Sequence, residues 1–375
     1  MGAGLRLGRI LGVEIRLDWS WFAIFLIVTW NLAVGLFSEP PLIRGAVSWA
    51  LGAAGSVLLF ASVLVHELAH ALMARRYGSE VQGITLFLFG GVAQIKGEPE
   101  APRQEVFIAG VGPLVSIVLA LACLGMAWSV PREIAYRAWV LLLGYLGVMN
   151  LALAAFNLVP GFPLDGGRML RAGIWHFTGD LRKATRWASL AGRFFAWVLI
   201  WYGLYMVAWQ GTLSGLWLVL VGWFLHTAAH SAYQQFVLRN LLDGVAVAEV
   251  MAHDVPAVQA EMSLPEFVDQ YMLRYDHSVY PVLRGATLVG VISTDDVREL
   301  KRERWAATRV GDLAQAPDQE RLVRDDQDAW EALTQMVETD ANRLLVMHDG
   351  KLEGVVSREA IMQRAEARVR RRQAA

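Results

Sequence analysis

The stretch Ser62-Val-Leu-Val-His66-Glu67-Leu-Ala-His70-Ala-Leu72 places three ionisable side chains inside a long apolar run. Ionisable groups are costly in a membrane-type segment, so they are functional candidates by default. His66 and His70 are four residues apart, which on a helix puts both imidazoles on one face. Glu67 is placed to accept a proton from water that a metal polarises, rather than to bind the metal. The stretch therefore predicts a hydrolytic zinc site within a bilayer.

Apolar residues are concentrated in the first two thirds of the chain. The 375 residues are 55% hydrophobic, with a mean hydropathy of +0.38, and an average soluble protein has about 45–50% apolar residues. Residues 19–238 carry the excess, whereas residues 243–375 resemble a soluble protein in composition. The single cysteine, Cys123, excludes an intramolecular disulfide and a cysteine-based zinc site. The net charge of -1 gives no reason to expect a nucleic-acid partner.

Most of six apolar segments approach the roughly 20 residues that a helix needs to cross the hydrocarbon core. They are residues 19–37, 46–74, 104–128, 138–159, 194–209 and 213–236, of which the fifth is short. The first is too long for the core of a signal peptide, so we expect a retained span. Residues 84–95, with Gly90-Gly91, predict a β-hairpin at the membrane edge, and an interfacial loop is the alternative. Residues 9–18 predict a short strand.

The distribution of basic residues predicts the orientation. With the N-terminus in the cytoplasm, the inner segments carry fourteen Lys and Arg residues and the outer loops only three, Arg44, Arg132 and Arg137. Positive charge is retained on the cytoplasmic side of short loops. We therefore expect a multi-pass protein of the plasma membrane whose N-terminus and C-terminal region are cytoplasmic.

The C-terminal region contains an internal repeat. Residues 282–293 align without gaps on residues 346–357, at an offset of 64, and each half has helical patterns on both sides. Two tandem βαββα-like units explain this better than chance. The predicted domains are 1–240 in the membrane, 243–305 and 306–368 for the two repeats, and 369–375 as a basic tail.

A catalytic zinc needs a third protein ligand and an open position for water. The best candidate is Asp165, which follows an apolar span and is flanked by Pro160, Pro163 and Gly166-Gly167. Broken backbone at membrane depth is tolerated where it lines a cavity enclosed by protein. An aspartate that caps the next helix remains an equal alternative at this point.

These motifs together resemble the site-2 protease family of intramembrane zinc metalloproteases, and most closely its branch with C-terminal tandem CBS (cystathionine-β-synthase-type) domains. The resemblance is carried by HELAH at 66–70, Asn157 with Pro160, Leu164-Asp165-Gly166 and the repeats, together with residues 90–93 and 109–116. It implies one zinc ion per chain, bound by His66, His70 and Asp165, with Glu67 as general acid and base. It also implies that Asn157 stabilises the oxyanion or holds the substrate strand. Ala69 stands where the family commonly has glycine.

The resemblance implies a polytopic α-helical membrane domain of about six transmembrane helices, a small β-hairpin or sheet at the membrane edge, and an α/β tandem CBS module. CBS clefts can bind adenine nucleotides, so ATP or AMP is a candidate ligand of Ser293 and Asp296. The second repeat has Ala360 where the aspartate should be. A module that only mediates dimerisation is the alternative, and pairing of CBS domains implies a homodimer or larger assembly.

The expected function is hydrolysis of peptide bonds in or near transmembrane segments of membrane-protein substrates. The substrate would unwind and add a strand to the edge of the 84–95 hairpin, which proline at Phe87 or Phe89 should impair. A catalytically silent membrane scaffold or metal-binding regulatory protein is the first alternative, and a transporter gated by the cytoplasmic module is the second. Intact His66, Glu67, His70 and Asp165 speak against a silent protein.

Overall fold

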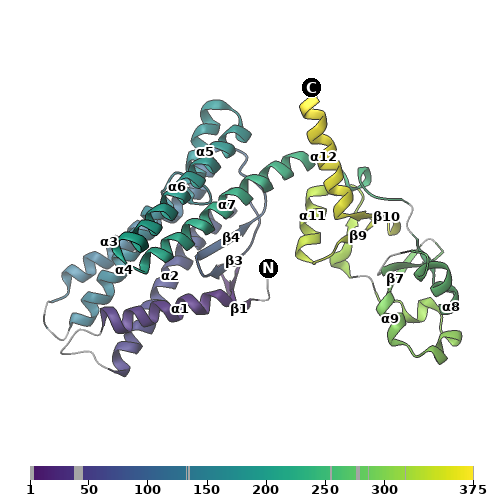
Figure 1. Ribbon diagram of the computed structural model, residues 1–375, viewed down its shortest axis with the longest axis horizontal. Coiled ribbons are helices and arrows are strands. Elements are labelled where there is room, and N and C mark those ends of the chain that lie inside the picture. Colours follow the sequence, from purple (N-terminus) through teal and green to yellow (C-terminus); the bar gives the residue numbers. More distant parts are fainter. Residues whose placement is uncertain are drawn as a thin grey trace. The chain divides into compact units, whose positions relative to one another are not determined.

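The computed structural model describes residues 4–37, 45–131, 133, 136–253, 256–275, 279–285, 287–316 and 318–374. The chain divides into two compact units, Met1–Gln235 and Phe236–Ala375, which are described separately (Figure 1). Two of the basic residues used to predict the orientation, Arg44 and Arg132, lie outside the described residues.

Seven helices occupy the membrane region of the described chain. They are α1 (Trp19–Asn31), α2 (Ala46–Arg76), α3 (Pro102–Ser129), α4 (Arg137–Asn157), α5 (Asp165–Thr178), α6 (Leu181–Gln210) and α7 (Ser214–Leu242). Five described segments are long and apolar enough to span a bilayer: α1 with the π-helical turn Leu32–Leu36 that continues it, and α2, α3, α4 and α6. These confirm the expectation of a helical membrane domain.

Two predicted spans differ in detail from the helices. The fifth, predicted as the short segment 194–209, is part of the 30-residue α6, whose polar first turns the hydropathy pattern had left out. The sixth lies in α7, which has 29 residues and is not among these five segments. His226 and His230 interrupt its apolar run.

A four-stranded sheet covers part of the helical bundle, in the order β1 (Leu5–Ile10), β2 (Val13–Leu17), β3 (Val81–Phe87), β4 (Gly90–Ile95). The β3–β4 pair is the predicted hairpin, and it is antiparallel. Residues 9–18 are not one strand, because the chain turns at Leu11-Gly12, where both residues have positive φ, and pairs β1 with β2. β2 and β3 are parallel neighbours, so β3 is internal and β4 has a free edge within the described chain.

The sheet is anchored to α2 by a hydrophobic cluster. Alternate residues of β2 are buried, as expected for a strand with one face on a core. The cluster joins buried residues of β2, β3, α2 and α3: Val13, Ile15, Leu17, Ala71, Ala74, Val81, Ile84, Leu86 and Ile108. This packing fixes the hairpin beside the helix that carries the histidines.

The second unit is built on a six-stranded sheet in the order β5-β6-β7-β10-β9-β8. Its strands are β5 (Val258–Gln259), β6 (Val279–Arg284), β7 (Thr287–Ser293), β8 (Leu322–Arg324), β9 (Arg343–His348) and β10 (Lys351–Ser357). β9 and β10 follow β6 and β7 at the predicted offset of 64 residues, since 343 − 279 and 351 − 287 both equal 64. The two repeats meet where β7 pairs with β10. The predicted repeat is thus present as two similar halves of one sheet.

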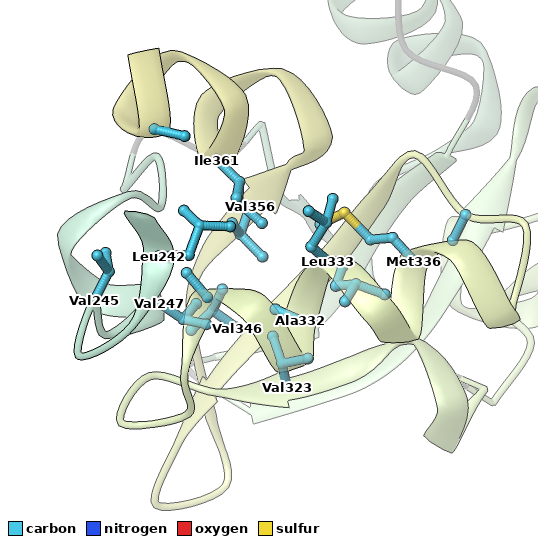
Figure 2. Close-up of a cluster of buried hydrophobic side chains, with 14 of the residues drawn as sticks. Leu242, Val245, Val247, Val323, Ala332, Leu333, Met336, Val346, Val356 and Ile361 are labelled. Atoms are coloured by element: carbon cyan, nitrogen blue, oxygen red, sulfur yellow. The ribbon is translucent and has the colours of Figure 1, made fainter. Parts of the chain in front are cut away.

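Helices pack on this sheet in both repeats: α8 (Leu264–Phe267), α9 (Thr294–Glu299), α10 (Val310–Leu313), α11 (Ala329–Glu338) and α12 (Arg358–Ala374). Figure 2 shows the core of the second repeat, where Leu242 and Val245 pack with Val346, Val356 and Ile361. The predicted basic tail coincides with the end of α12. Just before that tail, Arg368 donates hydrogen bonds to the carbonyl oxygens of Leu241 and Asp243.

Candidate active site

α2 and the start of α5 bring together the three predicted ligand residues. The Nε2 atoms of His66 and His70 are 3.1 Å apart. Asp165 Oδ2 lies 3.3 Å from His66 Nε2 and 3.1 Å from His70 Nε2. The histidines are 1% and 4% exposed. Three donor atoms from two distant segments therefore converge on one buried point.

The imidazoles are oriented by α3. His70 Nδ1 is 2.6 Å from the carbonyl oxygen of Ile108, and His66 Nδ1 is 2.9 Å from Ser116 Oγ. A carbonyl oxygen can only accept, so the proton of neutral His70 is on Nδ1 and its Nε2 lone pair is free. Metal-binding histidines are commonly held in this way by their second nitrogen.

Gly112 on α3 leaves the space between the donor atoms open. A Cβ at this position would lie 2.1 Å from His70 Nε2 and 2.7 Å from His66 Nε2. Zinc binds imidazole nitrogen and carboxylate oxygen at about 2.0–2.2 Å, and tetrahedral ligands at that distance are roughly 3.3 Å apart. The distances of 3.1–3.3 Å among His66 Nε2, His70 Nε2 and Asp165 Oδ2 match this value. The donor set therefore fits one zinc ion.

Asp165 is the first residue of α5, and Leu164 is the N-cap. The alternative of a capping aspartate therefore does not describe this helix. Two glycines allow the chain to turn here: a Cβ at Gly166 would lie 2.3 Å from the carbonyl oxygen of Leu158, and one at Gly167 would lie 2.2 Å from the carbonyl carbon of Gly161. The tight backbone packing of the loop before α5 sets the position of the carboxylate.

Glu67 lies against the β3–β4 hairpin. A Cβ at Gly91 would be 2.5 Å from Glu67 Cγ, and the backbone of Ala93 interacts with the carboxylate. Asn157 is the last residue of α4, and its Nδ2 is 3.5 Å from His66 Nε2. The five residues that the sequence singled out in the membrane domain thus surround one point, between α2, α4, α5 and β4.

Ser293 and Asp296 lie in the second unit, where they form a capping box at the start of α9. Ser293 Oγ accepts from the amide of Asp296 at 3.1 Å, and Asp296 Oδ2 accepts from the amide of Ser293 at 2.8 Å. Gln315 Nε2 donates to Asp296 Oδ1. Both side chains therefore have a structural role, and nucleotide binding by them stays a prediction.

Sequence reasoning assigned no role to Ile108, Gly112 or Ser116. Ile108 acts through its backbone carbonyl, which leaves no signal in the sequence. Gly112 and Ser116 belong to the stretch 109–116 that carries part of the family resemblance, and only their placement opposite α2 assigns them a task.

Comparison with known proteins gives the family of the chain. The profile of peptidase family M50 matches residues 54–199. "Putative zinc metalloprotease Rip3" of Mycobacterium tuberculosis is 38% identical over 320 residues, which are 84% of this chain and 80% of that protein. The chain belongs to peptidase family M50.

Other similarities extend over the rest of this M50 peptidase chain. "Putative zinc metalloprotease sll0528" of Synechocystis is 33% identical over 365 residues, covering 96% of this chain and 95% of that protein. The CBS domain profile matches residues 247–303 and 319–366. A solved structure, "Site-2 Protease from Methanocaldococcus jannaschii", is 31% identical with a TM-score of 0.46, over 62% of this chain and 95% of that one. The predicted resemblance to site-2 proteases with CBS domains is confirmed.

Proposed function

We propose that this chain is an intramembrane zinc endopeptidase that cleaves membrane proteins in or near their transmembrane segments. The observation that carries the proposal is the convergence of His66, His70 and Asp165 within 3.3 Å, among apolar helices and beside Glu67. Membership of peptidase family M50 supports the zinc-dependent chemistry. The apolar helices support the membrane setting.

In this proposal zinc is bound by His66 Nε2, His70 Nε2 and Asp165 Oδ2. When bound, zinc supplies Lewis acidity that polarises a peptide carbonyl and activates water. Glu67 accepts a proton from the attacking water and donates it to the leaving amine as the C–N bond breaks, so the products are a carboxylate and an amine. Asn157 Nδ2 donates a hydrogen bond to the developing oxyanion.

The free edge of β4 is the proposed binding site for the unwound substrate, because the edge of a sheet offers unpaired backbone groups to an added strand. Gly91 and Ala93 of β4 also contact the Glu67 side chain, which supports placing substrate here. Phe87 is not at this edge, because it is in β3 and pairs with Gly90 of β4, so proline at Phe87 does not test the edge. Phe89 lies in the turn between the strands, and its ring stacks on that of Phe224 with 4.2 Å between the ring centroids.

Val92, whose side chain is 44% exposed on β4, is the better position for this test. The amide of Val92 faces β3, because Val92 pairs with Thr85 while the carbonyl of the next β3 residue, Leu86, accepts from Asp18 on the other side. Val92→Pro therefore breaks the pairing of β4 with β3 and distorts the edge, so kcat/KM should fall at least tenfold while the zinc content is unchanged. Val92→Thr keeps the pairing and is the control. Unchanged cleavage by Val92→Pro would reject strand addition at β4.

The decisive experiment for the proposed function compares the wild type with Glu67→Gln. We expect about one zinc per chain in both proteins, and cleavage of membrane-anchored substrates only by the wild type. Asp165→Asn should lose zinc as well as activity. A wild type that binds zinc and cuts nothing in a broad survey of membrane proteins would favour the alternative of a silent scaffold.

We also propose that the second unit is a cytoplasmic regulatory module that binds ATP or AMP in its first repeat and pairs into a dimer. The pattern Gly290-Val-Ile-Ser293-Thr-Asp-Asp296 and the excess of basic residues on the proposed inner side support this. Titration calorimetry with AMP should detect binding that Asp296→Asn weakens. The absence of any heat with ATP or AMP would leave the module a purely structural role.

A further inference from the structure

A buried ion pair joins α3 and α5 close to the candidate metal site. Glu105 is fully buried and Arg171 is 8% exposed. Arg171 Nε donates to Glu105 Oε1 at 2.6 Å, and Arg171 Nη2 contacts the same oxygen. Glu105 Oε2 is buried without a hydrogen-bond partner in the described part of the chain. The pair is thus a costly and incompletely satisfied feature.

Stability does not explain such a pair well. Removing two charges from water costs several kcal/mol per ion, and replacement of a buried pair by apolar residues is often neutral or stabilising. The penalty is greater where lipid surrounds the protein. The position of the pair, between α3 and α5, points instead to a role at the site.

On the α3 side, the pair lies one turn from a residue that orients a ligand. Glu105 is in the first turn of α3, and Ile108 is three residues further along the helix, on a neighbouring part of its surface. The Ile108 carbonyl oxygen accepts the hydrogen bond from His70 Nδ1 at 2.6 Å. A shift of this end of α3 would move that carbonyl, and the His70 ring would follow.

On the α5 side, Arg171 holds both sides of Asp165. It lies six residues after Asp165 in the same helix. Its guanidinium carbon is 5.3 Å from the centre of the Phe162 ring, and Phe162 is three residues before Asp165. The amide of Phe162 also donates to the carbonyl oxygen of Ala188 on α6. The charge on Arg171 is therefore stacked against the loop that delivers the carboxylate.

We propose that Glu105 and Arg171 are a positioning pair for the metal site. By fixing α3 against α5, the pair sets the distance between the His70 imidazole and the Asp165 carboxylate. Neither residue is a metal ligand. Glu105 acts through Ile108, and Arg171 acts through Phe162. This inference rests on the proposed metal site. It predicts that metal affinity and ligand geometry change when the pair is removed, even if the protein remains fully folded.

The test uses the full-length protein loaded with Co²⁺, whose visible absorption reports ligand geometry without any need for activity. The main variant is E105L/R171M, which replaces both members of the pair by apolar side chains. E105Q and R171Q are the single variants, and R171K keeps the charge but loses the planar guanidinium. E100Q, which removes an exposed charge just before α3, is the matched control.

We expect E105L/R171M to keep the wild-type Tm or exceed it, and to bind Co²⁺ about tenfold more weakly or worse, with altered absorption bands. Loss of the groups that orient metal ligands typically costs 10–100-fold in affinity, and this pair acts one step further out. R171K should fall between E105L/R171M and the wild type. E100Q should match the wild type in affinity and spectrum.

Wild-type affinity and spectrum in E105L/R171M would overturn the inference while leaving the proposed function intact. Failure of that variant to fold would also overturn it, because the pair would then be structural. If the wild type itself binds no Co²⁺, both the inference and the proposed metal site are rejected. These outcomes are distinguishable in one set of titrations.

Discussion

Gly112→Ala tests the geometry of the candidate site most directly. The new Cβ would lie 2.1 Å from His70 Nε2 and 2.7 Å from His66 Nε2. Non-bonded heavy atoms are comfortable at about 3.5 Å or more, so the methyl group is roughly 1.4 Å too close to His70. Because Gly112 is in the middle of α3, the backbone cannot easily move away. The two imidazoles must turn instead.

That rotation breaks the hydrogen bonds from His70 to Ile108 and between His66 and Ser116. Each contributes about 0.5–1.5 kcal/mol, so orientation alone accounts for about 1–3 kcal/mol. A tenfold change in affinity corresponds to about 1.4 kcal/mol. Loss of the ligand geometry adds to this. We therefore expect zinc affinity to fall at least about 100-fold, and cleavage to fall with it.

The assay is competition between the purified protein and a zinc chelator, followed by measurement of zinc per chain. Gly110→Ala is the matched control, since a Cβ there has nothing within 4 Å. Circular dichroism checks that both variants keep their helices. A folded Gly112→Ala protein with wild-type zinc affinity would refute the assignment of the donor atoms.

Three further predictions concern residues around the site and in the second unit. Ser116→Ala should weaken zinc binding about 10–100-fold in the same competition assay, with little change in Tm, because His66 loses its orienting partner. Gly192→Ala should lower both Tm and zinc affinity, since its Cβ would lie 1.9 Å from the carbonyl oxygen of Phe162; Gly173→Ala, with open space around its Cβ, should not. The hydrogen bond to Asp325 raises the pKa of His348 above 6.5. An NMR titration should therefore show a lower pKa for His348 in the Asp325→Asn variant. The stability that this pair contributes is fully present below about pH 6.5 and is lost as pH rises through the raised pKa.

The family and the candidate site residues could be read from local patterns. A four-residue spacing puts His66 and His70 on one face of any helix, wherever that helix packs. The broken segment around Asp165 and the repeat at an offset of 64 are likewise visible in the chain itself. Hairpin β3–β4 was expected from Gly90-Gly91 between apolar runs, although the turn is formed by Leu88-Phe89 and the two glycines begin β4. The sequence was less reliable at residues 9–18, where apolar and polar residues alternate only weakly. One strand was expected there, and the structure has a hairpin.

The contribution of α3 could only be seen in the tertiary structure. The carbonyl of Ile108 exists in every residue type, and the buried pair of Glu105 with Arg171 joins residues 66 positions apart. The free edge belongs to β4 rather than to Phe87 because β2 pairs with β3, a contact between distant segments. Ser293 and Asp296 matched a nucleotide-binding pattern, yet the same two residues also satisfy a helix cap.

The sequence by itself therefore determined which side chains could bind zinc and which could move a proton, because residue type and helical spacing are local properties. The tertiary structure alone decided how these groups are held, since orientation depends on backbone groups and on the absence of a side chain at Gly112. A backbone carbonyl or a glycine orients a ligand only when its element packs against the helix that carries that ligand. His66 and His70 become a candidate metal site because α3 orients them and α5 brings Asp165 to the same point.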